Sequence, residues 1–409
     1  MSGETGGDGP AELSAVDDPA EMDGDPTELS AVDDPAEMDG DGLEVAVVGA
    51  GAVGATAAYD LARRGAAVTL YDREGVASGA SGRAAGVCYA AFAGRPDAEL
   101  AGESIERFRR LSGEETFPFV ECPYVWLARE GDDRRAAAIR EDVERMQAEG
   151  VVAVEVDGPA LGDRFPALRT DDVAVAGIAG AAGHTDPARY TACLAAAATG
   201  AGASLETGSA VAVRTDPPRV VVDGDERTVD AVLVAAGAHT GRLLAEADAP
   251  IAVKPYRTQA LTASATLPEP ICYDATGGFY VRPHPAGLLA GDGTEEVAAD
   301  PDGYERGADP EFPATLLDRV ATRCPDANPE LQEAWAGLCT ATPDGDPLVG
   351  RRREGVYVAT GFQGHGFMRA PATGERIAEE ILGGPGIEAF DPRRFSGEES
   401  FEIREGMAL

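Results

Sequence analysis

The sequence contains almost no lysine: Lys254 is the only one among 34 basic residues, and all the others are arginine. The net charge is −38 at pH 7, and the first 42 residues hold 14 acids and no base, which leaves −38 + 14 = −24 for the remainder. Such an excess of acid argues against nucleic acid and anionic membranes as partners. We interpret it as an acidic, solvated surface suited to molar salt, where the Debye length falls to about 3 Å. A halophilic, haloarchaeal source is therefore expected.

Metal-binding and disulfide patterns are also missing. The four histidines lack ligand spacing, and none of the six cysteines forms a CxxC pair, which is typical of reduced thiols and argues against a zinc site or a disulfide framework. No basic-then-apolar leader opens the sequence, and no apolar run approaches about 18 residues. We expect a cytoplasmic protein with no metal and no membrane span.

The first 42 residues contain a duplication. The segment Glu12–Asp25 recurs without change as Glu28–Asp41. Because the segment is acidic and poor in apolar residues, we predict a disordered tail over 1–42. A dispensable extension is the favoured interpretation, and a partner-binding tail is the alternative.

The most informative stretch is Val45–Gly54, VAVVGAGAVG, with an acid at Asp72 after the next apolar run. The order strand, glycine turn, helix, strand, acid is what a protein needs to hold the adenosine half of a dinucleotide. Gly49 makes the tight turn, Gly51 admits a pyrophosphate, and Gly54 lets the helix pack on the strand. The helix N-terminus then faces the phosphates, and the acid accepts a ribose hydroxyl. The pattern predicts a dinucleotide-binding domain.

Further strands of this kind recur along the chain. Residues 229–237 and 355–361 each predict a buried strand that enters a glycine turn, and Asp186-Pro187 predicts a helix start. Residues 97–150 are predicted to be helical, and alternation over 251–293 predicts antiparallel strands. We therefore predict an α/β fold with a Rossmann-like FAD/NAD(P)-binding domain that is discontinuous in sequence, and an inserted α+β substrate domain on a mixed or antiparallel sheet. The predicted boundaries are 43–95, 170–248 and 335–390 for the cofactor domain, and 96–169 and 249–334 for the substrate domain.

The C-terminal part adds a second glycine-rich turn, Gly361–Phe367, before a helix predicted from about Ala370 to Leu382. The positive end of that helix would favour an anionic ring system. In the strand Phe279–His284, alternation places Tyr280, Arg282 and His284 on one face.

Taken together, these segments resemble the D-amino-acid oxidase/sarcosine oxidase/glycine oxidase (DAO) family of FAD-dependent oxidoreductases over residues 43–385. Five ordered matches carry the resemblance: Gly49–Gly54 with Asp72; Ser78–Arg83 with Gly86; Gly183–Pro187; Val234–Gly237; and Trp335–Gly337 followed by Thr342–Gly350 and Gly361–Phe367. The resemblance implies FAD, a mixed-sheet substrate domain and oxidation of a carbon–nitrogen bond.

The motif and the resemblance also imply the site residues. The FAD-contacting positions are expected to be Gly49, Gly51, Val53, Gly54, Asp72, Arg73, Ser81, Arg83, Val211, Ala236, Gly237, Gly361, Gln363, Gly364, His365 and Gly366. Arg282 is the first candidate to hold a substrate carboxylate, since a guanidinium binds both oxygens. Tyr280, His284 and His365 complete the expected catalytic set, and a packing role is the alternative for each.

Three positions depart from the sarcosine oxidase pattern. The resemblance puts a flavin-attaching cysteine at the position of Gly337, an oxygen-activating lysine at Leu289 and a carboxylate-binding lysine at Met368. We therefore expect noncovalent FAD, and a dehydrogenase that uses a quinone or an electron-transfer protein is as well supported as an oxidase that uses oxygen.

The function expected from the sequence is oxidation of a small amine or amino acid of the D-amino acid, glycine or N-methyl type, with hydride transfer to flavin N5. The alternatives are a flavin dehydrogenase of a hydroxy acid or glycerol phosphate, and a flavin-binding subunit without its own turnover.

Overall fold

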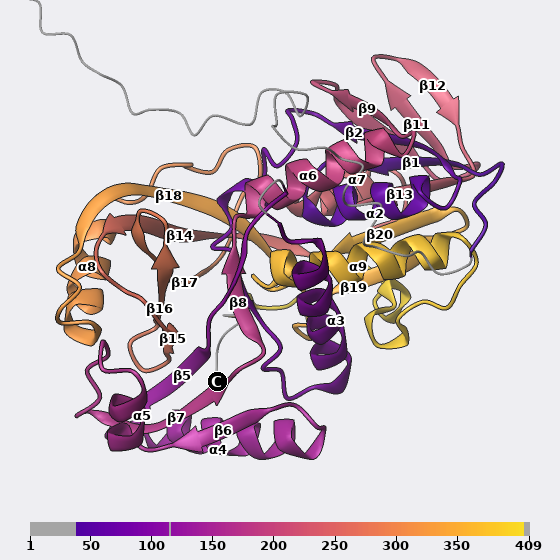
Figure 1. The fold of residues 1–409 in the computed structure, drawn as a ribbon. Helices are drawn as coiled ribbons and strands as arrows, with labels where there is room; N and C mark the ends of the chain where they lie inside the picture. Colours follow the sequence, from indigo (N-terminus) through magenta and orange to yellow (C-terminus); the bar gives the residue numbers. More distant parts are fainter. Residues whose placement is uncertain (1–37, 114–115, 405–409) are drawn as a thin grey trace, which may run out of the picture.

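The computed structural model describes residues 38–113 and 116–404, and the two principal sheets lie side by side in it (Figure 1). Most of the predicted acidic tail, including its first copy, lies outside the described residues. The described residues include the end of the second copy. There the backbone N–H of Gly40 donates to the carbonyl of Arg64 over 2.7 Å. Among the described residues, no helix is long and apolar enough to cross a bilayer.

One principal sheet has six strands in the order β19-β20-β13-β1-β2-β9. All neighbours pair in parallel except β19 with β20. The strands come from the beginning, middle and end of the chain: β1 (Glu44–Val48), β2 (Ala67–Asp72), β9 (Ser204–Thr207), β13 (Ala231–Val234), β19 (Leu348–Arg353) and β20 (Val356–Thr360). The prediction of a discontinuous Rossmann-like domain is confirmed.

Strand alternation gives this sheet two buried faces. Val45 and Val47 face a core with the helices, whereas Ala46 and Val48 face a core with a small antiparallel sheet. The helices of the first face are α2 (Ala52–Ala62), α3 (Arg95–Leu111), α6 (Pro187–Gly200) and α9 (Gly366–Ile381). The second face carries β10 (Val211–Arg214), β11 (Arg219–Val222), β12 (Asp225–Thr228) and α7 (Thr240–Ala245). Small residues bring α2 and α9 close together, since a Cβ on Gly374 would lie 2.5 Å from the Cβ of Thr56.

The second principal sheet has eight strands in the order β18-β14-β17-β16-β15-β5-β7-β6, antiparallel except between β15 and β5. Its strands are β5 (Tyr124–Arg129), β6 (Ala153–Val156), β7 (Val173–Ala179), β14 (Lys254–Ser264), β15 (Ile271–Asp274), β16 (Phe279–His284), β17 (Gly287–Ala298) and β18 (Glu330–Ala341). Helices α5 (Gly158–Arg164) and α8 (Phe312–Arg323) share a core with one face. Helix α4 (Asp133–Ala148) packs on β5, β6 and β7.

A three-stranded sheet, β3-β8-β4, lies between the two larger sheets (Figure 1). It consists of β3 (Val87–Tyr89), β4 (Phe119–Glu121) and β8 (Ala182–Thr185). The short helical turns η4 (Glu388–Phe390) and η5 (Pro392–Arg394) follow α9.

The prediction of continuous helix over 97–150 is wrong in its middle, where β4 and β5 replace it. In β5, Val125 and Leu127 enter the core under α5 and α8, and Tyr124 and Trp126 enter the opposite core. A strand buried on both faces shows no polar alternation, so its pattern did not separate it from the flanking helices.

The domain boundaries also differ in places. Strand β7 falls in a segment assigned to the cofactor domain but pairs with β5 in the eight-stranded sheet. Helix α3 falls in a segment assigned to the substrate domain but packs against α9. Helix α9 itself begins at Gly366, before the predicted start at Ala370, because the buried Phe367 and Met368 add a first turn.

Candidate cofactor and substrate site

A cavity of about 500 Å³ opens where the carboxyl ends of β1, β2, β13 and β20 face the eight-stranded sheet. Ligands of open parallel sheets bind at this edge. The walls come from four parts of the chain: the glycine turn after β1, residues 78–87, the turn after β13, and the turn before α9. Strands β14, β16 and β18 supply the facing wall.

The glycine turn after β1 has the form that the motif predicts. Gly49 has a φ of +112°, and a Cβ there would lie 2.5 Å from the carbonyl oxygen of Ala235. A Cβ on Gly54 would lie 1.9 Å from the oxygen of Gly49, so this position serves helix packing and does not line the cavity. A Cβ on Gly51 would meet Ser81 Oγ at 3.1 Å, and that hydroxyl accepts the N–H of Ala52 over 2.9 Å. The turn therefore keeps an open backbone at the N-terminus of α2.

Asp72 lies at the end of β2 and lines the cavity. Its Oδ2 accepts the N–H of Ala50 over 2.9 Å, and its Oδ1 accepts the N–H groups of Glu74 and Gly75 over 2.9 and 3.1 Å. The carboxylate thus holds the glycine turn to the loop after β2. Ser78 Oγ also bonds Oδ1 over 3.4 Å, whereas Oδ2 accepts only the N–H of Ala50 among the described residues and keeps a lone pair for a ribose hydroxyl.

A loop from the substrate domain crosses the cavity near Asp72. Asp302 of this loop accepts from Arg73 Nη1 over 2.7 Å, lies 3.0 Å from His239 Nε2 and pairs with Arg242. Arg306 of the same loop bonds Glu74 over 3.2 Å. These bonds, those from Arg73 first, hold the pKa of Asp302 well below its usual range. We name residues 299–307 the strap.

Ser81 and Arg83 belong to the short helix η2 (Ser81–Arg83). Both line the cavity, and Arg83 donates to the backbone oxygen of Gly79 over 3.0 Å. The indole N–H of Trp335 donates to the oxygen of Arg83 over 3.0 Å and ties this segment to β18.

The turn before α9 is held in left-handed conformations, with φ of +79° at Gly361, +52° at Gln363 and +85° at Gly364. The N–H of Gln363 donates to the oxygen of Thr340 over 2.9 Å. The side chain of Gln363 is buried, and its Oε1 has no hydrogen-bond partner among the described residues. Gln363 lines the cavity beside the N-terminus of a long helix, and its side-chain Nε2 donates to the backbone oxygen of Arg404 over 2.5 Å.

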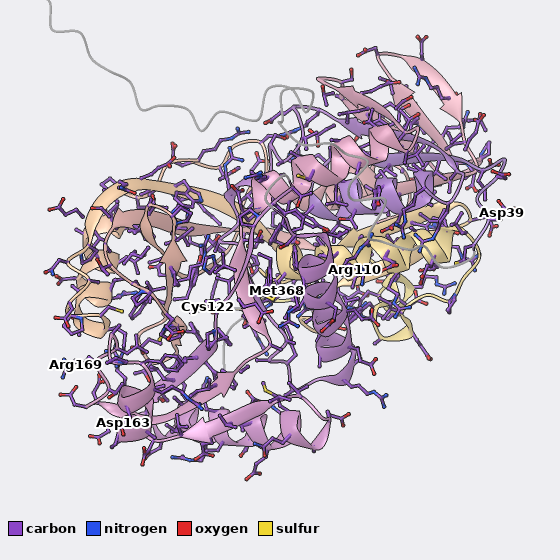
Figure 2. The ribbon with its side chains drawn as sticks, viewed as in Figure 1. Asp39, Arg110, Cys122, Asp163, Arg169 and Met368 are labelled. Carbon is purple, nitrogen blue, oxygen red and sulfur yellow. The ribbon has the colours of Figure 1, made fainter. Side chains whose placement is uncertain are left out.

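Aromatic side chains line the cavity beyond this turn. Tyr89 stacks on Tyr124 with ring centroids 4.1 Å apart, and its hydroxyl lies 3.0 Å from His365 Nε2. Burial raises the pKa of Tyr89 to about 12, and burial followed by the charge of Arg369 lowers the pKa of His365 to about 3. Both groups are therefore neutral near pH 7. Met368 lies next to them at the start of α9, in the middle of the molecule (Figure 2).

Tyr280 lines the cavity as expected, but Arg282 and His284 do not. As the alternation predicts, the three residues share one face of β16. Arg282 is only 3% exposed, and its guanidinium bonds the backbone oxygens of Ala85 and Pro283. His284 accepts the N–H of Ala286 through Nδ1. Arg282 bonds the backbone of Ala85 from outside the cavity, behind the lining segment 84–87, so the structure does not place Arg282 where a substrate carboxylate would bind.

The other expected positions gather in the cavity, apart from two. Gly54 and Gly361 belong to the turns that form the cavity but do not line it. A Cβ on Gly361 would lie 2.4 Å from Thr342 Cγ2. The expected residues that line the cavity are Gly49, Gly51, Val53, Asp72, Arg73, Ser81, Arg83, Val211, Ala236, Gly237, Tyr280, Gln363, Gly364, His365 and Gly366.

Several lining residues were missed from the sequence. These are Tyr89 and Tyr124 of the aromatic wall, Ile271 of β15, and the strap residues Pro301, Asp302, Tyr304 and Arg306. The β5 segment is apolar on both faces and the strap carries no motif, so neither marked these residues in the sequence. Tyr256 of β14 lines the cavity as well.

Like Met368, the other two departures from the family pattern, Leu289 and Gly337, lie in or beside the cavity wall. Leu289 is 3% exposed and packs with Ala260 and Trp335. Gly337 lies beside Arg83 in the cavity wall, and Cys339 also lines the cavity.

These features fit a flavin dinucleotide. The open turn at the N-terminus of α2 suits a pyrophosphate, and the left-handed turn at Gly361–Gly364 leads into the N-terminus of α9, whose positive end suits an anionic ring system. The aromatic and glycine-lined wall between these two points suits a flat, largely apolar ring system.

Comparisons with known proteins agree. Residues 44–380 match the family model described as FAD dependent oxidoreductase, DAO. Glycine oxidase of Geobacillus kaustophilus is 28% identical over 362 residues, which cover 82% of this chain and 92% of that protein. The tRNA-modifying bifunctional protein MnmC of Maricaulis maris is 30% identical over 375 residues, but the match covers 57% of that longer protein and 89% of this chain.

Solved structures show the same architecture. L-proline dehydrogenase from P. horikoshii superposes with a TM-score of 0.79 at 26% identity, covering 88% of this chain and 99% of that one. The structure of the Geobacillus glycine oxidase gives a TM-score of 0.77 at 25% identity, covering 87% of this chain and all of that one.

Proposed function

Because the chain belongs to the DAO family of FAD-dependent oxidoreductases, we propose that it oxidises the C–N bond of a small amine or amino acid of the glycine, D-amino acid or N-methyl type. When bound, FAD supplies the hydride acceptor for this reaction. Similar proteins named glycine oxidase, 4-methylaminobutanoate oxidase and L-proline dehydrogenase support this chemistry.

The observation that carries the proposal is the neutral pair of Tyr89 and His365 in the cavity wall. In the tautomer with the ring proton on Nδ1, Nε2 of His365 accepts the hydroxyl proton of Tyr89 over the 3.0 Å separation. Tyr124 is the second hydrogen-bond partner of the Tyr89 hydroxyl, so the oxygen of Tyr89 keeps one lone pair for an N–H donor. An amine is such a donor, and with its nitrogen lone pair free it can release hydride from the adjacent carbon.

The cofactor itself would be held at both ends of the cavity without a covalent bond. The glycine turn and Ser81 would hold the pyrophosphate, and Asp72 the ribose. The turn Gly361–Gly366 would hold the flavin ring. Gly337 stands at the position where some similar proteins attach the flavin through a cysteine. Glycine has no thiol for such a bond, which supports noncovalent binding.

We further propose that the electron acceptor is a quinone or an electron-transfer protein and not oxygen. The position that the family uses for an oxygen-activating lysine is Leu289, in an apolar cluster with Ala260 and Trp335. Leu289 itself therefore supplies no cation at that position to stabilise reduced oxygen.

A panel of turnover assays tests both parts. Sarcosine, glycine, proline, D- and L-amino acids, lactate and glycerol 3-phosphate would be compared in molar KCl, with a redox dye and, separately, with oxygen consumption. The proposal expects dye reduction with one of the amines and little oxygen uptake. Turnover of lactate or glycerol 3-phosphate alone would assign C–OH oxidation, and fast oxygen uptake would remove the acceptor proposal.

A further inference from the structure

Arg282 lies on β16, two residues after Tyr280, and is 3% exposed. Its Nε donates to the oxygen of Ala85 over 2.5 Å, and its Nη1 donates to the oxygen of Pro283 over 2.6 Å. The same Nη1 lies 3.4 Å from His184 Nδ1. The guanidinium is thus held by neutral acceptors.

This arrangement is unusual within the protein. The other buried arginines of the described residues each pair with a carboxylate, namely Arg64 and Arg107 with Asp60, Arg257 with Asp309, Arg323 with Asp274 and Arg369 with Asp97. Among residues 38–113 and 116–404, none forms an ion pair with Arg282. The acid that influences it is Asp186, whose carboxylate caps α6 by accepting the N–H of Arg189.

The other groups around Arg282 do not supply negative charge near pH 7. Burial raises the pKa of the Cys88 thiol and the Tyr280 phenol, so both stay protonated. Burial, with a contribution from Arg282, lowers the pKa of His184 to about 4, so that ring is neutral. His284 is also shifted toward the neutral form, chiefly by burial. A buried cation without a counter-charge is costly, and the cost falls when an anion forms nearby.

The contact at Ala85 connects this cation to the cofactor site. Residues 84–87 line the cavity, and three bonds fix this segment and its neighbour. Trp335 Nε1 donates to Arg83 O, Arg282 Nε donates to Ala85 O, and the N–H of Thr185 donates to Gly86 O over 3.0 Å. Of these three bonds, only the one from Arg282 comes from a charged side chain.

We propose that Arg282 is a positioning residue of the cofactor site, which fixes the cavity wall through Ala85 and raises the reduction potential of the bound flavin by placing an unneutralised cation behind that wall. The reduced flavin is the anionic state, so the cation stabilises it relative to the oxidised state. This role depends on FAD binding and not on the identity of the substrate. It replaces the substrate-carboxylate role that the sequence suggested for Arg282.

The test measures the two-electron midpoint potential and the rate of FAD release in three holoenzyme variants. Arg282→Met should reduce the preference for reduced over oxidised flavin at least tenfold, which lowers the potential by about 30 mV. Arg282→Lys keeps the charge and loses the planar fork, so it should keep most of the potential while releasing FAD faster. Arg352→Met is the matched control, because Arg352 also binds backbone oxygens, of Pro392, Phe395 and Ser396, but these residues do not line the cavity, whereas Ala85 does.

An unchanged potential in Arg282→Met would overturn the proposal. If that loss of charge instead raised KM for amino acids but not for amines without a carboxylate, Arg282 would be a substrate contact. If Arg282→Met does not fold, Arg282→Gln keeps a donor for Ala85 and removes the charge. Arg282→Gln must then lower the midpoint potential of the flavin as well. A midpoint potential equal to that of the wild type would contradict the proposed role of Arg282.

Discussion

The hydroxyl of Tyr89 lies 3.0 Å from Nε2 of His365, although 276 residues separate them along the chain. Tyr89 ends β3 and His365 precedes the first turn of α9, so the contact joins the small sheet to the C-terminal helix of the cofactor domain. Both side chains line the same cavity. The pair thus connects the expected flavin turn with an aromatic wall that the sequence did not reveal.

Removal of the Tyr89 hydroxyl should lower turnover without loss of cofactor. Tyr89→Phe keeps the stack on Tyr124 but loses a hydrogen bond worth about 0.5–1.5 kcal/mol, so kcat/KM for the amine should fall about two- to twelvefold. Tyr59→Phe is the control, because Tyr59 is buried in α2 away from the cavity. Steady-state kinetics with flavin content measured by absorbance check this. Equal kinetics for both variants would remove Tyr89 from the reaction.

The buried neutral His365 should make the protein less stable in mild acid. Its pKa of about 3 in the folded state lies below the value of about 6.5 expected when unfolded, so the unfolded state binds more protons as pH falls below about 6.5. The loss should be about 2 kcal/mol at pH 5 and grow until about pH 3. Urea unfolding of wild type and His365→Gln at pH 7.5 and pH 5 measures it. The variant should lose about 2 kcal/mol less than wild type, and parallel losses would contradict a neutral buried imidazole.

A side chain at Gly51 should prevent cofactor binding. A Cβ there points at Ser81 Oγ, 3.1 Å away, on the cavity side of the glycine turn, so the larger Gly51→Val would fill the space for a pyrophosphate. We expect a colourless protein with a near-wild-type circular dichroism spectrum. Gly180→Val is the control, because a Cβ at that exposed position meets nothing within 4 Å. A normally yellow Gly51→Val protein would show that the dinucleotide does not use this turn.

The strap should slow the release of FAD. Asp302→Asn weakens its bonds to Arg73, His239 and Arg242, and because these groups are substantially exposed, each contributes only about 0–1 kcal/mol. The FAD dissociation rate should therefore rise about two- to fivefold, measured by the recovery of flavin fluorescence after dilution. Asp171→Asn removes a similar exposed pair with Arg169, which lies at the periphery of the substrate domain (Figure 2), and should have no effect. Equal rates in the two variants would show that the strap does not close the site.

Much of the cofactor domain could be predicted because local chemistry determines it. The turn at Gly49 and the turn at Gly361 both require left-handed backbone, and glycine announces such positions in the sequence. Asp72 could be predicted as well, because it follows the motif at a fixed offset. Its additional bonds to Ala50, Glu74 and Gly75 depend on the loop conformation, which no spacing encodes.

The substrate side was harder to predict because tertiary packing determines it. Tyr124 faces the cavity only because β5 pairs in parallel with β15, and neighbouring residues of the strand are buried on both faces. Arg282 was placed on the correct face of β16, but the alternation does not say how far along the strand the cavity extends. The strap was missed because its sequence carries no motif. Its bonds to Arg73, His239 and Arg242, which identify it, are seen only in the folded structure.

The central claim, that this flavoprotein oxidises amines, is tested most directly by anaerobic reduction of the purified holoenzyme in molar KCl. Absorbance near 450 nm would be followed after addition of each amine, amino acid, hydroxy acid and glycerol 3-phosphate. The account predicts that an amine or amino acid bleaches the flavin band and yields one carbonyl product per flavin, whereas lactate and glycerol 3-phosphate leave the band intact. Bleaching by a hydroxy acid alone, or a flavin band that none of these compounds reduces, would contradict it.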